Sequence, residues 1–230
     1  MNIQEFISNY HNHPVLFIGT GISLRYLENS YSWDSLLQKI ASDFNPDPEY
    51  YLDLKAEHMQ STGYAYEQIA TQIEKDFNQY LKENRHGKFG YINDLFYENM
   101  LRGTNISRFK LYLTDLLKEV IIKDSALHEI AEFKKARKNI SSVITTNYDQ
   151  MIEQLFSFNP LIGNDILLSN PYGSVYKIHG CVTQPGKIII TESDYEEFNK
   201  KYELIRAQLL SLFIHNPIIF IGYNIGDKNI

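Results

Sequence analysis

The stretch that most constrains the fold is residues 141–149, with the sequence SSVITTNYD. Its first half is short, apolar and rich in β-branched residues, which is typical of a strand buried in a parallel sheet. The chain then turns through the polar and aromatic residues 146–149 before a helical pattern begins at Met151. In open α/β sheets, ligands lie in the crevice outside the carboxyl ends of the strands. This turn therefore predicts a ligand site at that end of a parallel sheet.

Glycine or polar loops follow three further apolar segments. A strand followed by Gly-x-Gly and a helix can bring backbone N–H groups against a pyrophosphate, although the same pattern alone fits a plain tight turn about as well. Leu24 replaces the third glycine of the dinucleotide-binding fingerprint, which argues against a dehydrogenase site. The segments and their loops are 15–18 before the loop 19–23 (GTGIS), 175–178 before His179 and Gly180, and 218–221 before 222–227 (GYNIGD).

Periodicity predicts the remaining elements. We expect strands at 166–168 and 187–191, and a long helix that Ser193 caps and that runs to about Leu212. Ser32 is expected to cap a helix that begins at Trp33, with Ser35 at its third position. Helical spacing also covers residues 3–10, 66–81 and 109–121. Together these elements indicate an α/β fold, with a Rossmann-like parallel sheet flanked by helices.

The helical stretch between the first two strands is long for a simple crossover. We therefore expect an inserted all-helical subdomain at about 46–137, with the core of the domain at about 1–45 and 138–230. A doubly wound sheet seldom leaves its last strand uncovered, and no helix follows residues 218–221 within the chain. We accordingly expect these 230 residues to be the N-terminal part of a longer protein.

Composition excludes several classes of function. The net charge of −6 argues against nucleic-acid binding through a broad basic surface. A single cysteine, Cys181, rules out a disulfide framework and a four-cysteine zinc site within this chain, and it is typical of the reducing cytoplasm. No apolar run approaches the roughly 18 residues that a membrane span needs. The sequence indicates a cytoplasmic domain that binds neither nucleic acid nor membrane.

The loops after the four strands, in this order, resemble the motifs of the sirtuin superfamily, and within it the sirtuin-like NAD-consuming domains of bacterial anti-phage defence proteins. The sirtuin Gly-Ala-Gly-x-Ser loop is similar to residues 19–23, and the Thr-Gln-Asn-x-Asp segment is similar to residues 145–149. The His-Gly pair is matched by His179 and Gly180, and the late Gly-x-Ser loop by residues 222–224. The resemblance covers nearly the whole chain except the helical block.

The resemblance implies that NAD+ binds with its nicotinamide–ribose bond beside Asn147 and His179. Asn147 would orient the ribose or the attacking water, and His179 would act as general base on a hydroxyl or a water. Gly21 and Ser23 would face the phosphates, and Asp149 would bind ribose hydroxyls or brace loops. The other expected nucleotide-binding residues are Gly19, Thr20, Arg25, Thr146, Gly180, Gly222, Tyr223, Asn224 and Asp227, of which Arg25 fits an ordinary surface position equally well.

Some of these residues have plainer interpretations. Asn147 could form an Asx turn that caps the next helix, and a histidine after a strand is often structural. Cys181 follows Gly180 directly and is expected to be a small buried residue rather than a nucleophile. Asp194 could favour only its own helix N-terminus, or lie near the crevice.

Two departures from the family pattern affect the expected activity. Protein-deacylating sirtuins carry four zinc-binding cysteines, which this chain lacks, and Thr146 replaces the usual glutamine. Both favour a metal-free NAD+ glycohydrolase, the effector of abortive-infection defence, over a deacylase. We expect a homo-oligomer controlled by a further C-terminal region or a phage-derived trigger protein. The alternatives are a module that senses NAD or ADP-ribose without turnover, and a zinc-free protein deacylase.

Overall fold

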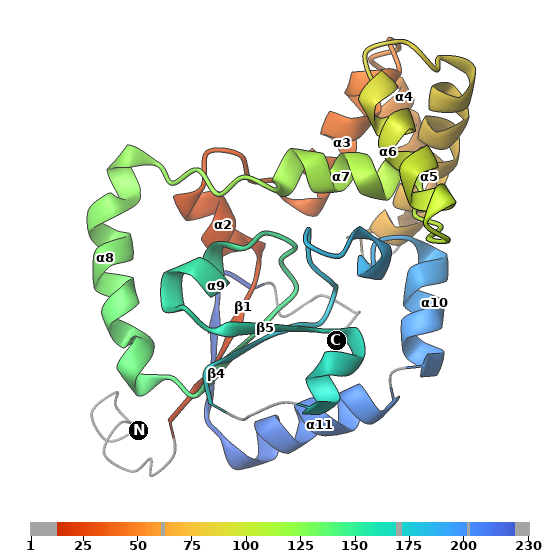
Figure 1. Ribbon diagram of the computed structural model, residues 1–230. Coiled ribbons are helices and arrows are strands. Elements are labelled where there is room, and N and C mark those ends of the chain that lie inside the picture. Colours follow the sequence, from red (N-terminus) through yellow and green to blue (C-terminus); the bar gives the residue numbers. More distant parts are fainter. Residues whose placement is uncertain (1–12, 61–62, 169–171, 202, 224–230) are drawn as a thin grey trace. The chain divides into compact units, whose positions relative to one another are not determined.

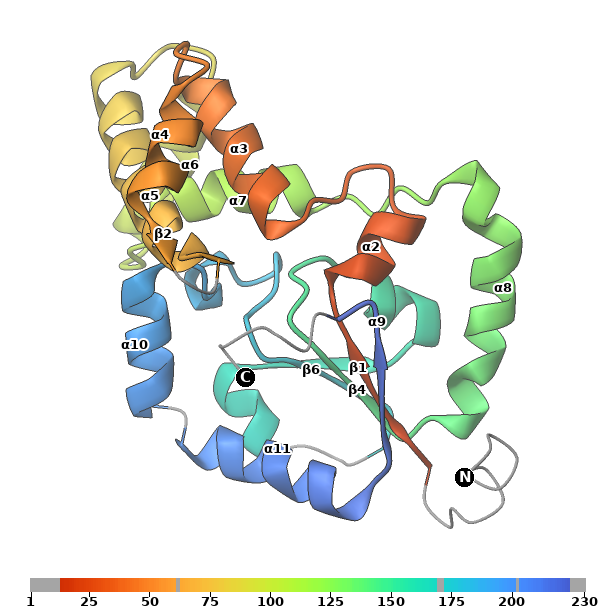
Figure 2. The same cartoon turned by 180° about the vertical axis from the view of Figure 1, so that it is seen from behind.

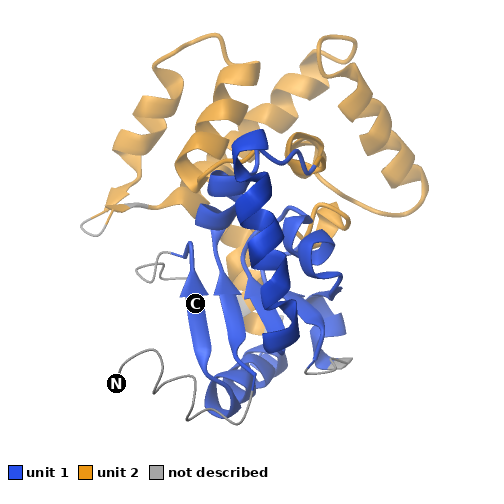
Figure 3. Cartoon of the chain, turned by 90° about the vertical axis from the view of Figure 1, so that its left-hand side faces the viewer, with its two compact units in different colours: residues 1–28, 120–180, 202–230 blue, residues 29–119, 181–201 orange. Residues whose placement is uncertain are grey.

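The computed structural model describes residues 13–60, 63–168, 172–201 and 203–223. The expected helix at 3–10 and the residues Asn224 and Asp227 lie outside this part of the chain. The described residues fall into two compact units, coloured separately in Figure 3. Unit 1 is drawn from residues 1–28, 120–180 and 202–230, and unit 2 from residues 29–119 and 181–201.

Unit 1 is built on a five-stranded sheet within the described residues (Figures 1 and 2). All of its strand pairs are parallel, and β1 is paired along its length with β4 on one side and β7 on the other. The Rossmann-like α/β prediction is thus confirmed. In spatial order the strands are β5 (Asn159–Ile162), β6 (Ser174–Lys177), β4 (Ser142–Thr145), β1 (Val15–Ile18) and β7 (Ile218–Ile221).

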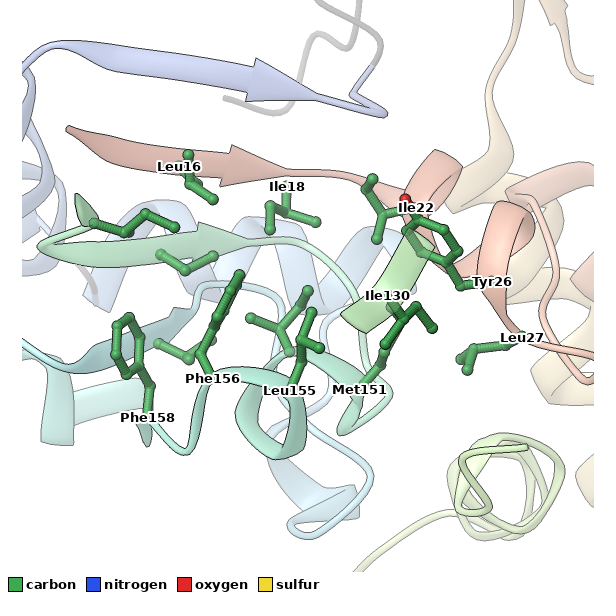
Figure 4. Packing of buried hydrophobic residues seen from close by; sticks show 14 of the residues in the cluster. Leu16, Ile18, Ile22, Tyr26, Leu27, Ile130, Met151, Leu155, Phe156 and Phe158 are labelled. Carbon is green, nitrogen blue, oxygen red and sulfur yellow. The ribbon is translucent and has the colours of Figure 1, made fainter. Parts of the chain in front are cut away.

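Strands β1, β4 and β6 are buried because helices cover both faces of the sheet, whereas Ile219 and Phe220 of the edge strand β7 are exposed. On one face, Leu16 and Ile18 pack with residues of α2 (Thr20–Tyr26), α8 (Leu127–Lys135) and α9 (Met151–Phe156), as Figure 4 shows in part. On the other face, Val15 and Phe17 pack with residues of α11 (Glu203–His215) and of the 3-10 helix η3 (Gly163–Leu168). Alternate residues of β1 therefore serve two separate cores, as the period of two in a strand requires.

The position of β1 matters for ligand binding. The next strand of this sheet along the chain, β4, pairs on one side of β1, and β7 pairs on the other side. Such a reversal of strand order is the topological switch point at which open α/β sheets bind ligands. The loop after β1 and the loop after β7 flank this point.

Unit 2 is helical apart from a small hairpin of β2 (Met59–Gln60) and β3 (Gly63–Tyr64). Its core is aromatic: the ring of Phe77 lies 5.5 Å from Phe44, 5.5 Å from Phe89 and 5.2 Å from Tyr112. Ser32 caps α3 through a capping box with Ser35, as predicted. The helices are α3 (Trp33–Phe44), α4 (Tyr50–Glu57), α5 (Tyr66–Glu83), α6 (Gly90–Leu101), α7 (Arg108–Leu117) and α10 (Glu192–Lys201).

Two predicted strands are wrong. Residues 166–168 belong to η3. Of residues 187–191, Lys187 ends the 3-10 helix η4 (Pro185–Lys187) and 188–191 follow it without joining a strand. Ile188, Ile189 and Ile190 are apolar because they are buried in unit 2, not because they pair in a sheet. A strand that the sequence did not predict, β5, begins with Asn159 and Pro160, and proline is tolerated there because β5 is an edge strand.

The helix expected from Ser193 to Leu212 is two helices, α10 and α11, in different units. The apolar spacing continues across both because Tyr195 and Phe198 are buried in unit 2, while Ile205 and Leu212 are buried in unit 1. Periodicity alone does not reveal that the two halves serve different cores.

The boundaries of the two units differ from the expected boundaries of the helical subdomain at about residues 46 and 137. Unit 2 includes α3, which begins before residue 46, and it also includes residues 181–201. Helix α8, which lies before residue 137, packs in unit 1 instead. Among the described residues, no helix combines the length and the apolar character that crossing a bilayer would require.

Candidate functional site at the carboxyl ends of the strands

The turn after β4 fixes Asn147 in a buried position. Thr145 Oγ1 donates to the carbonyl of Ile18 (2.8 Å) and accepts from the backbone N–H of Asn147 (3.1 Å). The Asn147 side chain donates through Nδ2 to Gly19 O (3.1 Å) and to Ser23 Oγ (2.9 Å). The turn is therefore tied to β1 and to the glycine loop that follows it.

One polar atom of this arrangement has no partner within the described residues. Asn147 is 3% exposed, and its Oδ1 atom accepts no hydrogen bond there. A buried acceptor without a donor costs free energy, on the order of 1–3 kcal/mol, unless a ligand or a water supplies one. The expected ligand, NAD+, carries ribose hydroxyls that can donate to such an atom. The asparagine thus fits the expected nucleotide chemically.

Asp149 forms the Asx-type turn that the sequence suggested as an alternative role for Asn147. Its Oδ1 accepts from the backbone N–H of Met151 (3.0 Å) at the start of α9, which is the Asx-type interaction. Its Oδ2 accepts from the hydroxyl of Ser23 (2.7 Å). Of the two roles expected for Asp149, the structure shows the bracing of loops, and the Ser23 hydroxyl is occupied by the same interaction.

A buried ion pair beneath this turn was not predicted. Lys177, the last residue of β6, has a fully buried side chain, and its Nζ lies 3.0 Å from Glu153 Oε1 in α9. The same ammonium donates to the backbone carbonyl of Asp149. A lysine that ends an otherwise apolar strand, and a glutamate within the apolar pattern of α9, were the signals in the sequence.

The expected glycine loop at 19–23 is largely the start of α2, which begins at Thr20, and its backbone packs against the backbone of the loop after β7. Gly19 N donates to Ile221 O (3.1 Å), and Gly21 N donates to Gly222 O (2.9 Å). A Cβ on Gly21 would lie 2.8 Å from Gly222 Cα, and Gly222 has a positive φ of 61°. These glycines are thus needed for loops to approach each other, a reason different from the expected approach of a phosphate.

His179 lies at the end of the neighbouring strand. The parallel register pairs Thr145 of β4 with Lys177 of β6, so the turns that follow both strands leave the same edge of the sheet. Gly180 N donates to Lys177 O (3.1 Å), and Gly180 has a φ of 91°, which glycine adopts without strain. His179 is 2% exposed, so the imidazole is held away from bulk water.

Arg25 does not join these residues. It lies on the exposed side of α2 and forms a two-pronged ion pair with Glu129 of α8, with N–O distances of 2.8 to 3.1 Å. Hydrogen bonding from Arg25 lowers the pKa of the Glu129 carboxyl. The surface interpretation of Arg25 is the one that matches its position.

The remaining expected residues flank the same strand ends. Thr20, Thr146 and Tyr223 are partly buried, and the Tyr223 ring lies 4.7 Å from Phe17. Cys181 is fully buried and belongs to unit 2, and Asp194 pairs there with Lys110. Within the described ranges, no cluster of three or more histidine, cysteine or acidic side chains is placed to hold a metal ion.

Comparison with known proteins finds a family model that matches the C-terminal part of the chain. Residues 141–230, which include the Asn147 turn, the His179 turn and β7, match the family model of the SIR2-like domain. With the parallel sheet and the motif order, this match confirms the expected resemblance to sirtuin-like domains.

Individual relatives are bacterial proteins. The chain is 23% identical over 227 residues to the NAD(+) hydrolase ThsA of Enterococcus faecium, covering 95% of this chain and 38% of the relative. It is 23% identical over 241 residues to the NAD(+) hydrolase ThsA of Bacillus cereus (99% and 41%). It is 30% identical over 124 residues to defense-associated sirtuin 2 of Bacillus subtilis (50% and 12%). The chain thus spans about two fifths or less of the length of these relatives.

Proposed function

We propose that this domain is an NAD+ glycohydrolase that cleaves NAD+ to nicotinamide and ADP-ribose as an effector of anti-phage defence. Two relatives that align with nearly the whole chain are named NAD(+) hydrolases, and a third is named a defense-associated sirtuin. The observation that carries the proposal is the buried Asn147, whose Oδ1 has no partner among the described residues and which lies in the turn after β4, next to the turn after β6 that carries His179.

The reaction suits these two side chains. The bond between nicotinamide and C1′ of the ribose breaks, and nicotinamide leaves with the electron pair as a neutral molecule. A water attacks C1′ of the oxocarbenium-like ribose, and its proton passes to a base. Asn147 Oδ1 would accept from a ribose hydroxyl or from the water and so orient it. His179 would take the proton, because imidazole titrates near neutral pH.

The test is nicotinamide release from NAD+, without an acyl-peptide, by the full-length protein that contains this chain. We expect release by the wild type and a loss of at least about 100-fold in His179→Ala and Asn147→Ala, the scale of a lost general base or orienting group. Matched controls in unit 1 are His13→Ala and Asn159→Ala, at exposed positions. Both controls should release nicotinamide at the wild-type rate.

Other outcomes separate the alternatives. A folded full-length protein that binds NAD+ under activating conditions but releases no nicotinamide would be a sensing module. Release that requires an acylated peptide would identify a deacylase.

We further propose that the complete protein acts in the cytoplasm as a homo-oligomer and causes abortive infection. A region outside these 230 residues, or a phage-derived protein, would trigger it. Sedimentation of the full-length protein with and without NAD+ tests the oligomer, and survival of infected cells that carry His179→Ala tests the defence role.

A further inference from the structure

We propose that Lys177 is a positioning residue for the hydrolysis: its buried ammonium sets the position of the Asn147 turn relative to His179. The inference rests on the proposed function, because the two residues it positions are the proposed catalytic pair.

The ammonium joins β6 to the turn that follows β4. Lys177 belongs to β6, two residues before His179, while its Nζ donates to the backbone carbonyl of Asp149, two residues after Asn147 on the β4 side. A single side chain therefore connects the segment that carries the proposed base to the segment that carries the proposed orienting amide. The backbone bond from Ile178 N to Thr145 O (3.1 Å) lies between the same two segments.

From Asp149 the connection reaches the Asn147 side chain. The Asp149 carboxylate accepts from Ser23 Oγ (2.7 Å), and Ser23 Oγ accepts from Asn147 Nδ2 (2.9 Å). Because Nδ2 is held, the opposite atom of the amide, Oδ1, is fixed in direction. The network thus determines where the buried acceptor points, from Lys177 through Asp149 and Ser23.

The energetics of the buried pair of Lys177 and Glu153 favour a role in positioning the turn rather than in stabilising the fold. Lys177 and Glu153 are 0% and 7% exposed in their side chains, so both charges are removed from water. A buried ion pair is often no more stabilising than apolar side chains of similar volume, because the desolvation penalty offsets the attraction. An apolar pair would fill the space below the turn, but it would offer no donor to the Asp149 carbonyl.

The test uses the full-length protein with Lys177→Met combined with Glu153→Gln, so that no unpaired charge stays buried. We expect this double variant to fold and to lose about 10-fold or more in kcat for nicotinamide release, with KM changed less than about threefold, as for a misplaced catalytic group. The control Lys123→Met removes another lysine bond to a backbone carbonyl, Leu24 O (2.8 Å), at a partly buried position of unit 1. It should retain wild-type kcat.

Hydrogen exchange supplies a second readout that does not need activity. The backbone amides of Asn147 and Met151 bond to Thr145 Oγ1 and Asp149 Oδ1, so the double variant should exchange them about 10-fold faster or more, while the amides of β4 stay protected. A double variant with wild-type kcat and exchange, or one that does not fold, would assign Lys177 a purely structural role and overturn the proposal. Absence of release by the wild type would instead contradict the proposed function, and exchange at the turn would still decide whether Lys177 positions it.

Discussion

The side-chain amide of Asn147 donates to the hydroxyl of Ser23 over 2.9 Å, although 124 positions separate the two residues. Both side chains are buried, and the Ser23 hydroxyl donates a hydrogen bond to the Asp149 carboxylate. Ser23 of α2, together with the carbonyl of Gly19, therefore holds the turn after β4 against the segment that follows β1.

Removing this hydroxyl should affect both stability and activity. In Ser23→Ala, Asn147 Nδ2 loses an acceptor and Asp149 Oδ2 loses a donor, so we expect unfolding to require about 1–3 kcal/mol less. Nicotinamide release should fall because the amide of Asn147 is less firmly oriented. Denaturant unfolding and a release assay measure the two effects. Ser125→Ala, at an exposed position of unit 1, is the control that should change neither.

The contact between the glycine loops should not tolerate even one methyl group. In Gly21→Ala the new Cβ would lie 2.8 Å from both the Cα and the O of Gly222, which are backbone atoms that cannot rotate away. We expect a loss of about 1–3 kcal/mol in unfolding free energy, as for overpacked cores, and weaker binding of NAD+. In Gly87→Ala the methyl would lie 3.5 Å from Asn84 O, an ordinary contact, so thermal unfolding of that variant should match the wild type.

Unit 2 should become more stable at neutral pH when Glu74 loses its charge. Burial raises the pKa of Glu74, and hydrogen bonding from Ser107 and the charge of Lys110 only partly oppose it. A carboxyl whose pKa is raised by folding binds its proton more tightly in the folded state. Its contribution to stability is therefore greatest below the unfolded pKa and declines as pH rises through the folded pKa.

We accordingly expect Glu74→Gln to raise the unfolding temperature at pH 7 and to flatten the decline in stability that accompanies rising pH. Thermal unfolding between pH 4 and 7 measures this. Glu57→Gln changes an exposed carboxylate and should follow the wild-type profile. If Glu74→Gln were less stable than the wild type at pH 7, the carboxylate would be contributing more through Lys110 and Ser107 than its burial costs.

We expect the ion pair between Asp194 and Lys110 to contribute more to stability than the other ion pair of α10 described below. The two side chains are 17% and 12% exposed, and they meet at 2.6 Å. Asp194 Oδ2 also accepts from the backbone N–H groups of Ile190 (3.1 Å) and Thr191 (3.0 Å). Asp194→Ala should cost about 3 kcal/mol, the lower part of the range for breaking a buried pair.

The same helix offers a control for this prediction. Glu196 pairs with Lys200 at 3.6 Å, with side chains that are 65% and 76% exposed. Glu196→Ala should therefore cost less than about 1 kcal/mol, as exposed pairs do. Equal losses in the two variants would show that exposure does not decide the strength of these pairs.

The sheet and its polar turns could be predicted from the sequence because both follow from local residue patterns. Of the five strands that the described residues place in the main sheet, four are short and mostly apolar, and Asn147, His179 and the glycines lie within a few residues after them. The pairing of Ser23 with Asp149 and the burial of Lys177 depend on side chains from strands that are distant in the chain. The sequence marks Lys177 as a charged residue in an apolar segment but does not reveal its distant partners. Residues 188–190 are likewise apolar and buried, yet nothing local shows that they do not pair in the sheet.

The packing of Gly21 against Gly222 also sets an order of events during protein synthesis. The two positions are 201 residues apart. At translation rates of about 5–20 residues per second, roughly 10–40 s pass between their appearances on the ribosome. Until β7 and its loop emerge, the loop after β1 lacks the backbone partner that shapes it. A nascent chain therefore cannot form this backbone contact until the segment that carries Gly222 has been synthesised.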